Sequence, residues 1–242
     1  MTTTGTGPLE NGLVLCRVRT GISGRLVSLP FSDHCDPLVD GQGDLLALST
    51  CLPGQLRDTR SSGLELRPRF VVPHGLAKGA SYWLHTLDLT PSAERIFRGF
   101  HASCTRRAVR RAQRESLTCE AGSSERLLTG FYELLRLTRR RHGLPPQPIM
   151  WFRNLIDCLG DGLVIHVASK NGQPVAAIVT LSFKDTLVYK YGGSDSRYHR
   201  LGSVPFVFWR AILWAKAQGI EKLDLGRSAL DIAGRLLYKH LG

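Results

Sequence analysis

Residues 163–225 decide the fold class: LVIHVASKNGQPVAAIVTLSFKDTLVYKYGGSDSRYHRLGSVPFVFWRAILWAKAQGIEKLDL. The hydrophobic period in the first part is two residues, which is typical of strands. Asn171-Gly172 separates the first two strands and is a strong hairpin signal, because both residues tolerate a positive φ. An amphipathic helix ending at Gly219 follows the third strand. The expected elements are strands at 163–169, 174–183, 187–191 and 222–225, and a helix at 204–218. They predict an α/β unit, in which an antiparallel meander is joined to a further strand by a crossover helix.

Upstream of this stretch the hydrophobic spacing becomes helical. From residue 93 apolar residues recur every three or four positions, and arginines occupy the other faces. A second helix is expected to begin with a capping-box-like Ser123 or Ser124 and Glu125 and to end at Gly143, before a proline-rich segment. The expected helices run from residue 93 and over 124–142, 149–159 and 230–241.

Residues 1–89 have the pattern of short strands and loops. The segment 44–52 is compatible with either a helix or a strand. The expected strands are 13–18, 25–29, 64–72 and 82–89.

Composition limits the class of protein. The 242 residues are 43% hydrophobic and 21% charged, which is typical of a globular chain with a buried core. Lys and Arg outnumber Asp and Glu by 32 to 20, so the net charge of +12 favours polyanionic partners such as phosphates, nucleic acid or an acidic lipid surface.

Cysteine spacing and hydropathy argue against three further classes. The six cysteines are scattered without a C-x-x-C pair, which argues against a zinc site and favours reduced thiols. No uncharged apolar run approaches the roughly 20 residues that span a bilayer. Residues 1–12 lack the basic-then-apolar order of a signal peptide, so we expect a cytoplasmic protein. From the cysteine spacing and the apolar runs we further expect no metal and no integral membrane segment.

Seven short segments of the sequence, taken in order, resemble those of the FemAB-like branch of the GNAT acyltransferase superfamily. The resemblance is strongest to the FemAB-related type associated with exopolysaccharide or PEP-CTERM systems. The segments are SLPFSDHCDPL (28–38), HASCTRRAVRRAQRESL (101–117), FYELLRLTRRRHGLPPQP (131–148), PVAAIVTL (174–181), YKYGGSD (189–195), LDLGRS (223–228) and LLYKHLG (236–242). The resemblance implies an α/β (α+β) fold with a GNAT-like mixed sheet and flanking helices. It implies two tandem GNAT-like domains, over 1–120 and 121–242, of which we expect the first to be incomplete.

The loop before the helix at 204–218 is the candidate cofactor site. In the GNAT fold the corresponding helix N-terminus binds the pyrophosphate of coenzyme A, because free backbone N–H groups and the helix dipole favour an anion. The candidate ligands are Arg197, Arg200, Gly202 and Ser203. Arg200 departs from the family pattern by replacing its first glycine, and FemAB-like relatives use aminoacyl-tRNA as donor, so acyl-coenzyme A and aminoacyl-tRNA both remain candidates. The alternative is an ordinary helix start with Ser203 as N-cap.

The resemblance implies catalytic roles for Asp33, His34 and Lys239. His34 suits a general base because its ordinary pKa lies near 6.5. Lys239 matches a family lysine that stabilises the charge of the tetrahedral intermediate. The alternatives are a structural turn at Asp33 and a cation placed at a helix C-terminus for Lys239.

Substrate contacts are expected from Tyr189, Tyr191, Asp195 and Arg227. Tyr189 and Tyr191 are expected on one strand face, where they line an acceptor groove and one of them protonates the leaving group. Packing in the core or rim is the alternative.

The predicted function is transfer of an activated acyl or aminoacyl group to an amine or hydroxyl of a cell-envelope, peptidoglycan or polysaccharide precursor. Arginines of the basic helix offer phosphate contacts, including those of tRNA, or form a solvated face. The alternatives are a non-catalytic module with a GNAT-like fold that binds nucleic acid or an anionic surface, and an inactive truncated remnant.

Overall fold

The structure is a computed structural model that describes residues 11–20, 23–69, 77 and 79–229. The chain divides into two compact units, Met1–Ala80 (unit 1) and Ser81–Gly242 (unit 2). The predicted boundary between residues 120 and 121 lies within a strand of unit 2. That boundary concerned the two GNAT-like repeats rather than compact units, and it stays a prediction.

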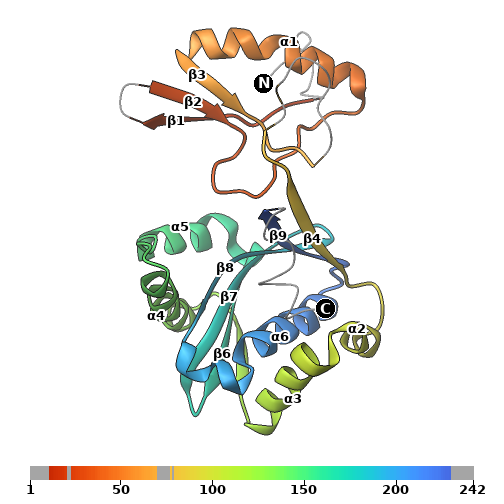
Figure 1. Cartoon of the computed structure of the whole chain (residues 1–242), viewed down its shortest axis with the longest axis vertical. Coiled ribbons are helices and arrows are strands. Elements are labelled where there is room, and N and C mark those ends of the chain that lie inside the picture. Colours follow the sequence, from red (N-terminus) through yellow and green to blue (C-terminus); the bar gives the residue numbers. More distant parts are fainter. Residues whose placement is uncertain (1–10, 21–22, 70–76, 78, 230–242) are drawn as a thin grey trace. The chain divides into compact units, whose positions relative to one another are not determined.

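Unit 1 is a three-stranded sheet with one long helix (Figure 1). Strand β1 (Cys16–Thr20) pairs antiparallel with β2 (Ser23–Val27), and β2 pairs parallel with β3 (Ser61–Glu65). The segment 44–52, which is compatible with either a helix or a strand, belongs to helix α1 (Gln42–Asp58). Leu48 and Leu52 are the buried residues of α1, at the spacing of one helical turn.

Unit 2 contains a six-stranded sheet in the order β4-β9-β8-β7-β6-β5. All neighbours are antiparallel except β8 and β9, which are parallel. The strands are β4 (Tyr82–Asp88), β5 (Thr118–Gly122), β6 (Leu163–Lys170), β7 (Gln173–Phe183), β8 (Thr186–Ser194) and β9 (Lys222–Ala229). The predicted meander and the crossover helix are confirmed. Asn171 and Gly172 make the predicted tight turn, with φ of 51° and 77°.

Helices cover both faces of this sheet, so unit 2 has three layers (Figure 1). They are α2 (Ala93–Gly99), the π-helical turn η1 (Ala102–Arg106), α3 (Arg107–Arg114), α4 (Glu125–Arg141), α5 (Ile149–Leu159), the 3₁₀ turns η2 (Gly160–Gly162) and η3 (Ser196–Leu201), and α6 (Ser203–Ala217). Alternate residues of β7 enter opposite cores: Ala176 and Ile178 pack with α3 and α6, whereas Ala177 and Val179 pack with α4 and α5.

The structure of unit 2 differs from the sequence-based prediction in two places. The basic helix is broken, because α2 ends at Gly99 and a π-helical turn precedes α3. Strand β5 was missed altogether. The predicted helix over 230–241 lies outside the described residues.

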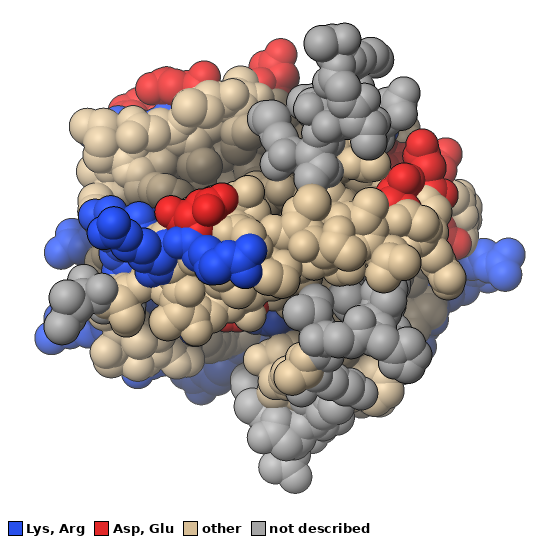
Figure 2. Space-filling view, turned by 90° about the horizontal axis from the view of Figure 1, so that it is seen from above, with Lys and Arg blue, Asp and Glu red and all other residues tan. Residues whose placement is uncertain are grey.

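Charge is unevenly distributed on the surface. Figure 2 shows Lys and Arg side chains in a dense group on one flank of the face viewed, with acidic side chains in smaller, separate groups. Among the described residues, no helix is both long and apolar enough to cross a membrane.

Candidate active site

Strands β8 and β9 pair over only three residues and then diverge. The last pair joins Val188 to Asp224; beyond it β8 remains on β7 as far as Ser194, whereas β9 remains on β4 as far as Ala229. The register of β8 on β7 shifts between the pairs Thr180–Tyr189 and Val179–Tyr191, so Lys190 is the extra residue of a β-bulge, which bends a strand and increases its twist. The sheet therefore opens between two strands that begin as parallel neighbours.

Strand β9 bends at a glycine as it leaves β8. Gly226 has a φ of 83°, a conformation that favours glycine, and its N–H donates to the carboxylate of Asp224 at 2.7 Å. Asp224 is 4% exposed, so this hydrogen bond satisfies a buried carboxylate at the point of divergence.

Tyr189 is the first residue of β8 beyond the last β8–β9 pair. Its ring packs edge-on against Phe208 of α6, with 4.9 Å between the ring centroids. Its hydroxyl lies so close to Gly192 that a Cβ at that position would be 2.5 Å from the oxygen. Burial raises the pKa of Tyr189 to about 12, against the opposing effect of the Arg139 charge. At neutral pH this phenol can donate a proton but does not act as a base.

Tyr191 faces the opposite side of the sheet. Its ring packs edge-on against Phe152 of α5 at 5.1 Å, and its hydroxyl accepts a hydrogen bond of 3.0 Å from the indole of Trp151. The prediction that Tyr189 and Tyr191 share a face is wrong, because the bulge at Lys190 resets the two-residue alternation.

An ion pair organises the segment that follows β8. Asp195 is 6% exposed and accepts hydrogen bonds from the Arg197 backbone N–H at 2.9 Å and from its guanidinium at 2.6 Å. Hydrogen bonds from Arg197 hold the pKa of Asp195 below its usual value. A phosphate bound by Arg197 would therefore compete with Asp195, whereas Arg200 is exposed on the same turn.

The start of α6 is covered by α3. Gly202 has a φ of 78°, and a Cβ there would lie 2.2 Å from the backbone oxygen of Ala108. Ser203 is fully buried, so a phosphate could reach its amide only if α3 moved away. Gly202 itself is the N-cap, and the Ser203 hydroxyl donates to the Tyr198 carbonyl, so the alternative assignment of Ser203 as N-cap is wrong.

Residues 101–240 match the family model described as an acetyltransferase (GNAT) domain, and they make up more than half of the chain. The protein belongs to the GNAT acetyltransferase family. The diverging strands β8 and β9, and the helix α6 that connects them, lie within this matched region.

Solved structures similar to this GNAT protein share its fold at low sequence identity. FemX superposes with a TM-score of 0.73 at 13% identity, over 95% of this chain and 79% of FemX. The C-terminal domain of a putative lysylphosphatidylglycerol synthetase from Agrobacterium fabrum has a TM-score of 0.63 at 16% identity, over 93% of this chain and 73% of that one. L-PGS from Bacillus licheniformis has a TM-score of 0.58 at 15% identity, over 93% and 68%. No curated protein matches the chain. The predicted fold, with tandem GNAT-like domains, is confirmed.

The predicted catalytic residues of the GNAT protein do not all fall in one unit. Asp33 and His34 are partly buried in the segment between β2 and α1 of unit 1. This segment is tied to residues 67–69, because the Cys35 N–H donates to the Arg67 carbonyl and Asp36 pairs with Arg69. Lys239 lies outside the described residues. The roles of Asp33, His34 and Lys239 stay predictions.

Side-chain contacts of Arg227 and Ser228 link β9 to β4, the edge strand of the sheet in this GNAT protein. The guanidinium of Arg227 lies 4.0 Å from the ring centroid of Tyr82 on β4. On the same two strands, the imidazole Nε2 of His85 and the hydroxyl of Ser228 are 2.7 Å apart. Sequence reasoning missed the His85–Ser228 pair, because the two residues are 143 positions apart and only the pairing of β4 with β9 brings them together.

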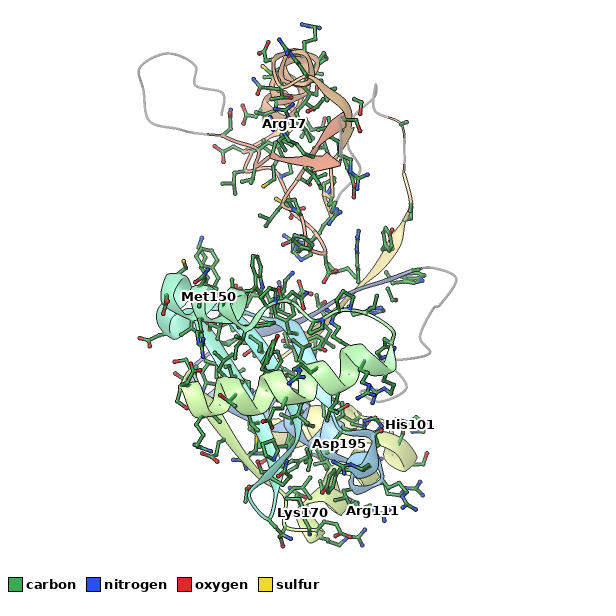
Figure 3. The ribbon with its side chains drawn as sticks, turned by 90° about the vertical axis from the view of Figure 1, so that its left-hand side faces the viewer. Arg17, His101, Arg111, Met150, Lys170 and Asp195 are labelled. Carbon is green, nitrogen blue, oxygen red and sulfur yellow. The ribbon has the colours of Figure 1, made fainter. Side chains whose placement is uncertain are left out.

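The described residues contain no group of three or more His, Cys, Asp or Glu side chains that could hold a metal ion. Figure 3 shows Asp195 and Arg111 at one end of unit 2, so the segment after β8 and the arginines of α3 are neighbours, in agreement with the contacts between η3 and α3.

Proposed function

We propose that this GNAT acyltransferase moves an acyl or aminoacyl group from a phosphate-bearing carrier to an amine or hydroxyl of a cell-envelope or polysaccharide precursor. The carrier is acyl-coenzyme A or aminoacyl-tRNA. The observation that carries the proposal is the opening between β8 and β9, with the phenol of Tyr189 directly beyond their last pair. The fold that the protein shares with FemX supports the wider class of aminoacyl donors.

In the proposed reaction the acceptor amine or hydroxyl attacks the carbonyl carbon of the donor. The bond to the carrier breaks as the tetrahedral intermediate collapses, and the leaving group takes a proton. Tyr189 is the proposed donor of that proton, because it lies directly beyond the last β8–β9 pair and a phenol is protonated at neutral pH. Backbone N–H groups on the edge of β8 that no longer faces β9 stabilise the oxyanion.

The two candidate donors release different leaving groups. Proton transfer from any tyrosine to a thiolate is uphill, because the ordinary pKa of tyrosine, about 10, exceeds that of a cysteine thiol, about 8.5. An alkoxide, such as the ribose oxygen released from an aminoacyl ester, is a far stronger base. Donor assays should therefore include both aminoacyl-tRNA and acyl-coenzyme A.

The roles predicted from the sequence for the other residues are kept as separate parts of the proposal. Arg197 and Arg200 hold the phosphate of the carrier, and Arg227 contacts the substrate. Asp33 or His34 accepts the proton of the attacking group, and Lys239 stabilises the intermediate. Loss of turnover on His34→Ala or Lys239→Ala in the full chain supports these roles, and unchanged turnover in either variant removes that residue from the site.

The decisive experiment compares two phenylalanine variants on opposite faces of β8. Tyr189→Phe keeps the ring against Phe208 but removes the hydroxyl, and we expect kcat to fall about 100-fold with little change in KM. Tyr191→Phe is the matched control, since its hydroxyl faces α5 and accepts from Trp151. Equal kcat values in wild type and Tyr189→Phe would exclude Tyr189 as the proton donor.

A second function is favoured by one observation on α3. Arg107, Arg110, Arg111 and Arg114 are exposed, and among the described residues none of them has a carboxylate partner. A non-catalytic module that binds nucleic acid would use this face and would lose affinity steeply with salt. Transfer activity that survives Arg110→Ser/Arg111→Ser, without measurable duplex binding in wild type, would exclude this second function.

A further inference from the structure

The segment between Glu133 and Asp157 combines positive charge with exposed apolar side chains. It contains five arginines and no acidic residue over residues 134–156. Four of the arginines lie in the last two turns of α4, and none of these four has a carboxylate partner among the described residues. They are Arg136, Arg139, Arg140 and Arg141. The fifth, Arg153, pairs with Glu125.

The apolar side chains of this segment are unusually open to solvent. The exposed fractions are 50% for Leu144, 53% for Met150 and 40% for Trp151. Buried Phe152 holds α5 in the core, so these neighbours are held outward by a helix that is itself anchored. The Trp151 indole is further oriented by its hydrogen bond to Tyr191.

Hydrogen bonds fold the connection between α4 and α5 back along α4. The Leu144 N–H donates to the Arg139 carbonyl at 2.9 Å, and the Tyr132 hydroxyl donates to the Gln147 carbonyl at 3.1 Å. Tyr132, Arg136 and Arg140 are four residues apart and lie on neighbouring positions of one helix face. The connection therefore runs back along α4, with Leu144 next to Arg139, and α5 continues this strip beside the first half of α4, where Arg153 pairs with Glu125.

We propose that this surface, formed by Arg136, Arg140, Arg141, Leu144, Met150 and Trp151, docks the protein on an anionic lipid bilayer. Arginines draw the surface to acidic headgroups, while a tryptophan and flexible aliphatic side chains favour the headgroup level of the membrane. Nucleic acid would use the arginines but would leave Leu144 and Met150 in water. The lipid surface is the partner that matches both chemistries, and the inference does not rest on the proposed transfer reaction.

Helix α3 offers a matched control surface on the same unit. Arg110 and Arg111 are exposed and lie on α3, which has no large apolar side chain exposed. Figure 3 shows Arg111 and Met150 at opposite ends of unit 2, so the control charges lie far from the apolar side chains of the α5 part of the proposed surface. Removing two charges from either place changes the net charge of the protein equally, so a difference between the variants reports the location and not the total charge.

The test is cosedimentation of the full chain with vesicles of phosphatidylcholine alone and of phosphatidylcholine with phosphatidylglycerol at equal parts. We expect binding to the anionic vesicles only, and about 30-fold weaker binding for Arg140→Ser/Arg141→Ser. Leu144→Ser/Met150→Ser should also weaken binding, and the remaining binding should be lost at high salt. Arg110→Ser/Arg111→Ser should bind within about threefold of wild type, since surface cations act over about a Debye length.

Three results would overturn the proposal. They are no preference of the wild type for anionic vesicles, equal losses in the α3 and α4 double variants, and full binding by Leu144→Ser/Met150→Ser. Circular dichroism of each variant checks that it is folded. Because vesicle binding is measured without donor or acceptor, a negative result leaves the transfer reaction to be judged by the kinetics of Tyr189→Phe.

Discussion

A buried histidine in the central sheet predicts how the stability of unit 2 depends on pH. His166 on β6 is 1% exposed, and its Nε2 lies 3.1 Å from the Thr180 hydroxyl oxygen. The ring of Trp214 meets it edge-on at 5.4 Å, so the imidazole lies against an apolar neighbour. Burial lowers the pKa of His166 to about 4.

The magnitude follows from the difference between the folded and unfolded pKa values. The unfolded chain protonates near pH 6.5 and the folded protein near pH 4, and this difference corresponds to about 3 kcal/mol. Because the folded pKa is the lower one, the contribution is fully present above pH 6.5. It is lost as the pH falls from 6.5 toward 4, because over this range a proton binds His166 in the unfolded chain but not in the folded protein.

The assay is urea unfolding of the full chain, followed by circular dichroism at pH 7.5 and pH 4.5. His166→Gln keeps an amide near the Thr180 hydroxyl but does not titrate. The wild type should lose about 2–3 kcal/mol more than His166→Gln between the two pH values. Carboxylates contribute equally to both proteins and cancel in the comparison. Parallel losses in wild type and variant would refute the assignment of a neutral, buried imidazole.

Three other substitutions test the packing that positions the site, each by urea unfolding. Gly202→Ala should destabilise the protein by about 2–4 kcal/mol, because its Cβ would meet the Ala108 carbonyl at a positive φ; a shift of less than about 1 kcal/mol would contradict the close approach of α3. Phe152→Ala should cost about 3–5 kcal/mol, since the ring is buried against Phe131 and Tyr191. Glu120→Ala should leave the unfolding midpoint unchanged, because its ion pair is exposed, and a clear decrease would contradict that.

Elements with a local signal were predictable from the sequence. Helix α5 was predicted at its observed bounds, and the hairpin was predicted because Asn171-Gly172 encodes its own turn. Strand β5 was missed because its five residues show no alternation and it is held by pairing with β6, which lies some 40 residues later in the chain. The pairing of β4 with β9 has no local signal at all.

The candidate site was located by resemblance, but its geometry depends on tertiary contacts. The segment after β8 was identified correctly as the start of the crossover helix. Its burial was not predictable, since it arises from the approach of Ala108 on α3 to Gly202, 94 positions later in the chain. The prediction that Tyr189 and Tyr191 share one face was wrong, because a bulge has no distinctive sequence pattern.

The bulge accounts for the structural role of each of the first five residues of the segment YKYGGSD (189–195). With Lys190 outside the ladder, Tyr189 turns toward α6 and Tyr191 toward α5, so one strand supplies a phenol to each face. Gly192 then leaves room for the Tyr189 hydroxyl, and Gly193 lets the strand approach the α4 backbone, where a Cβ would lie 2.5 Å from Leu135 N. The same irregularity bends β8 where it leaves β9. Opening of the sheet and placement of Tyr189 are therefore a single structural event, and a substitution that restored regular pairing at Lys190 would remove both together.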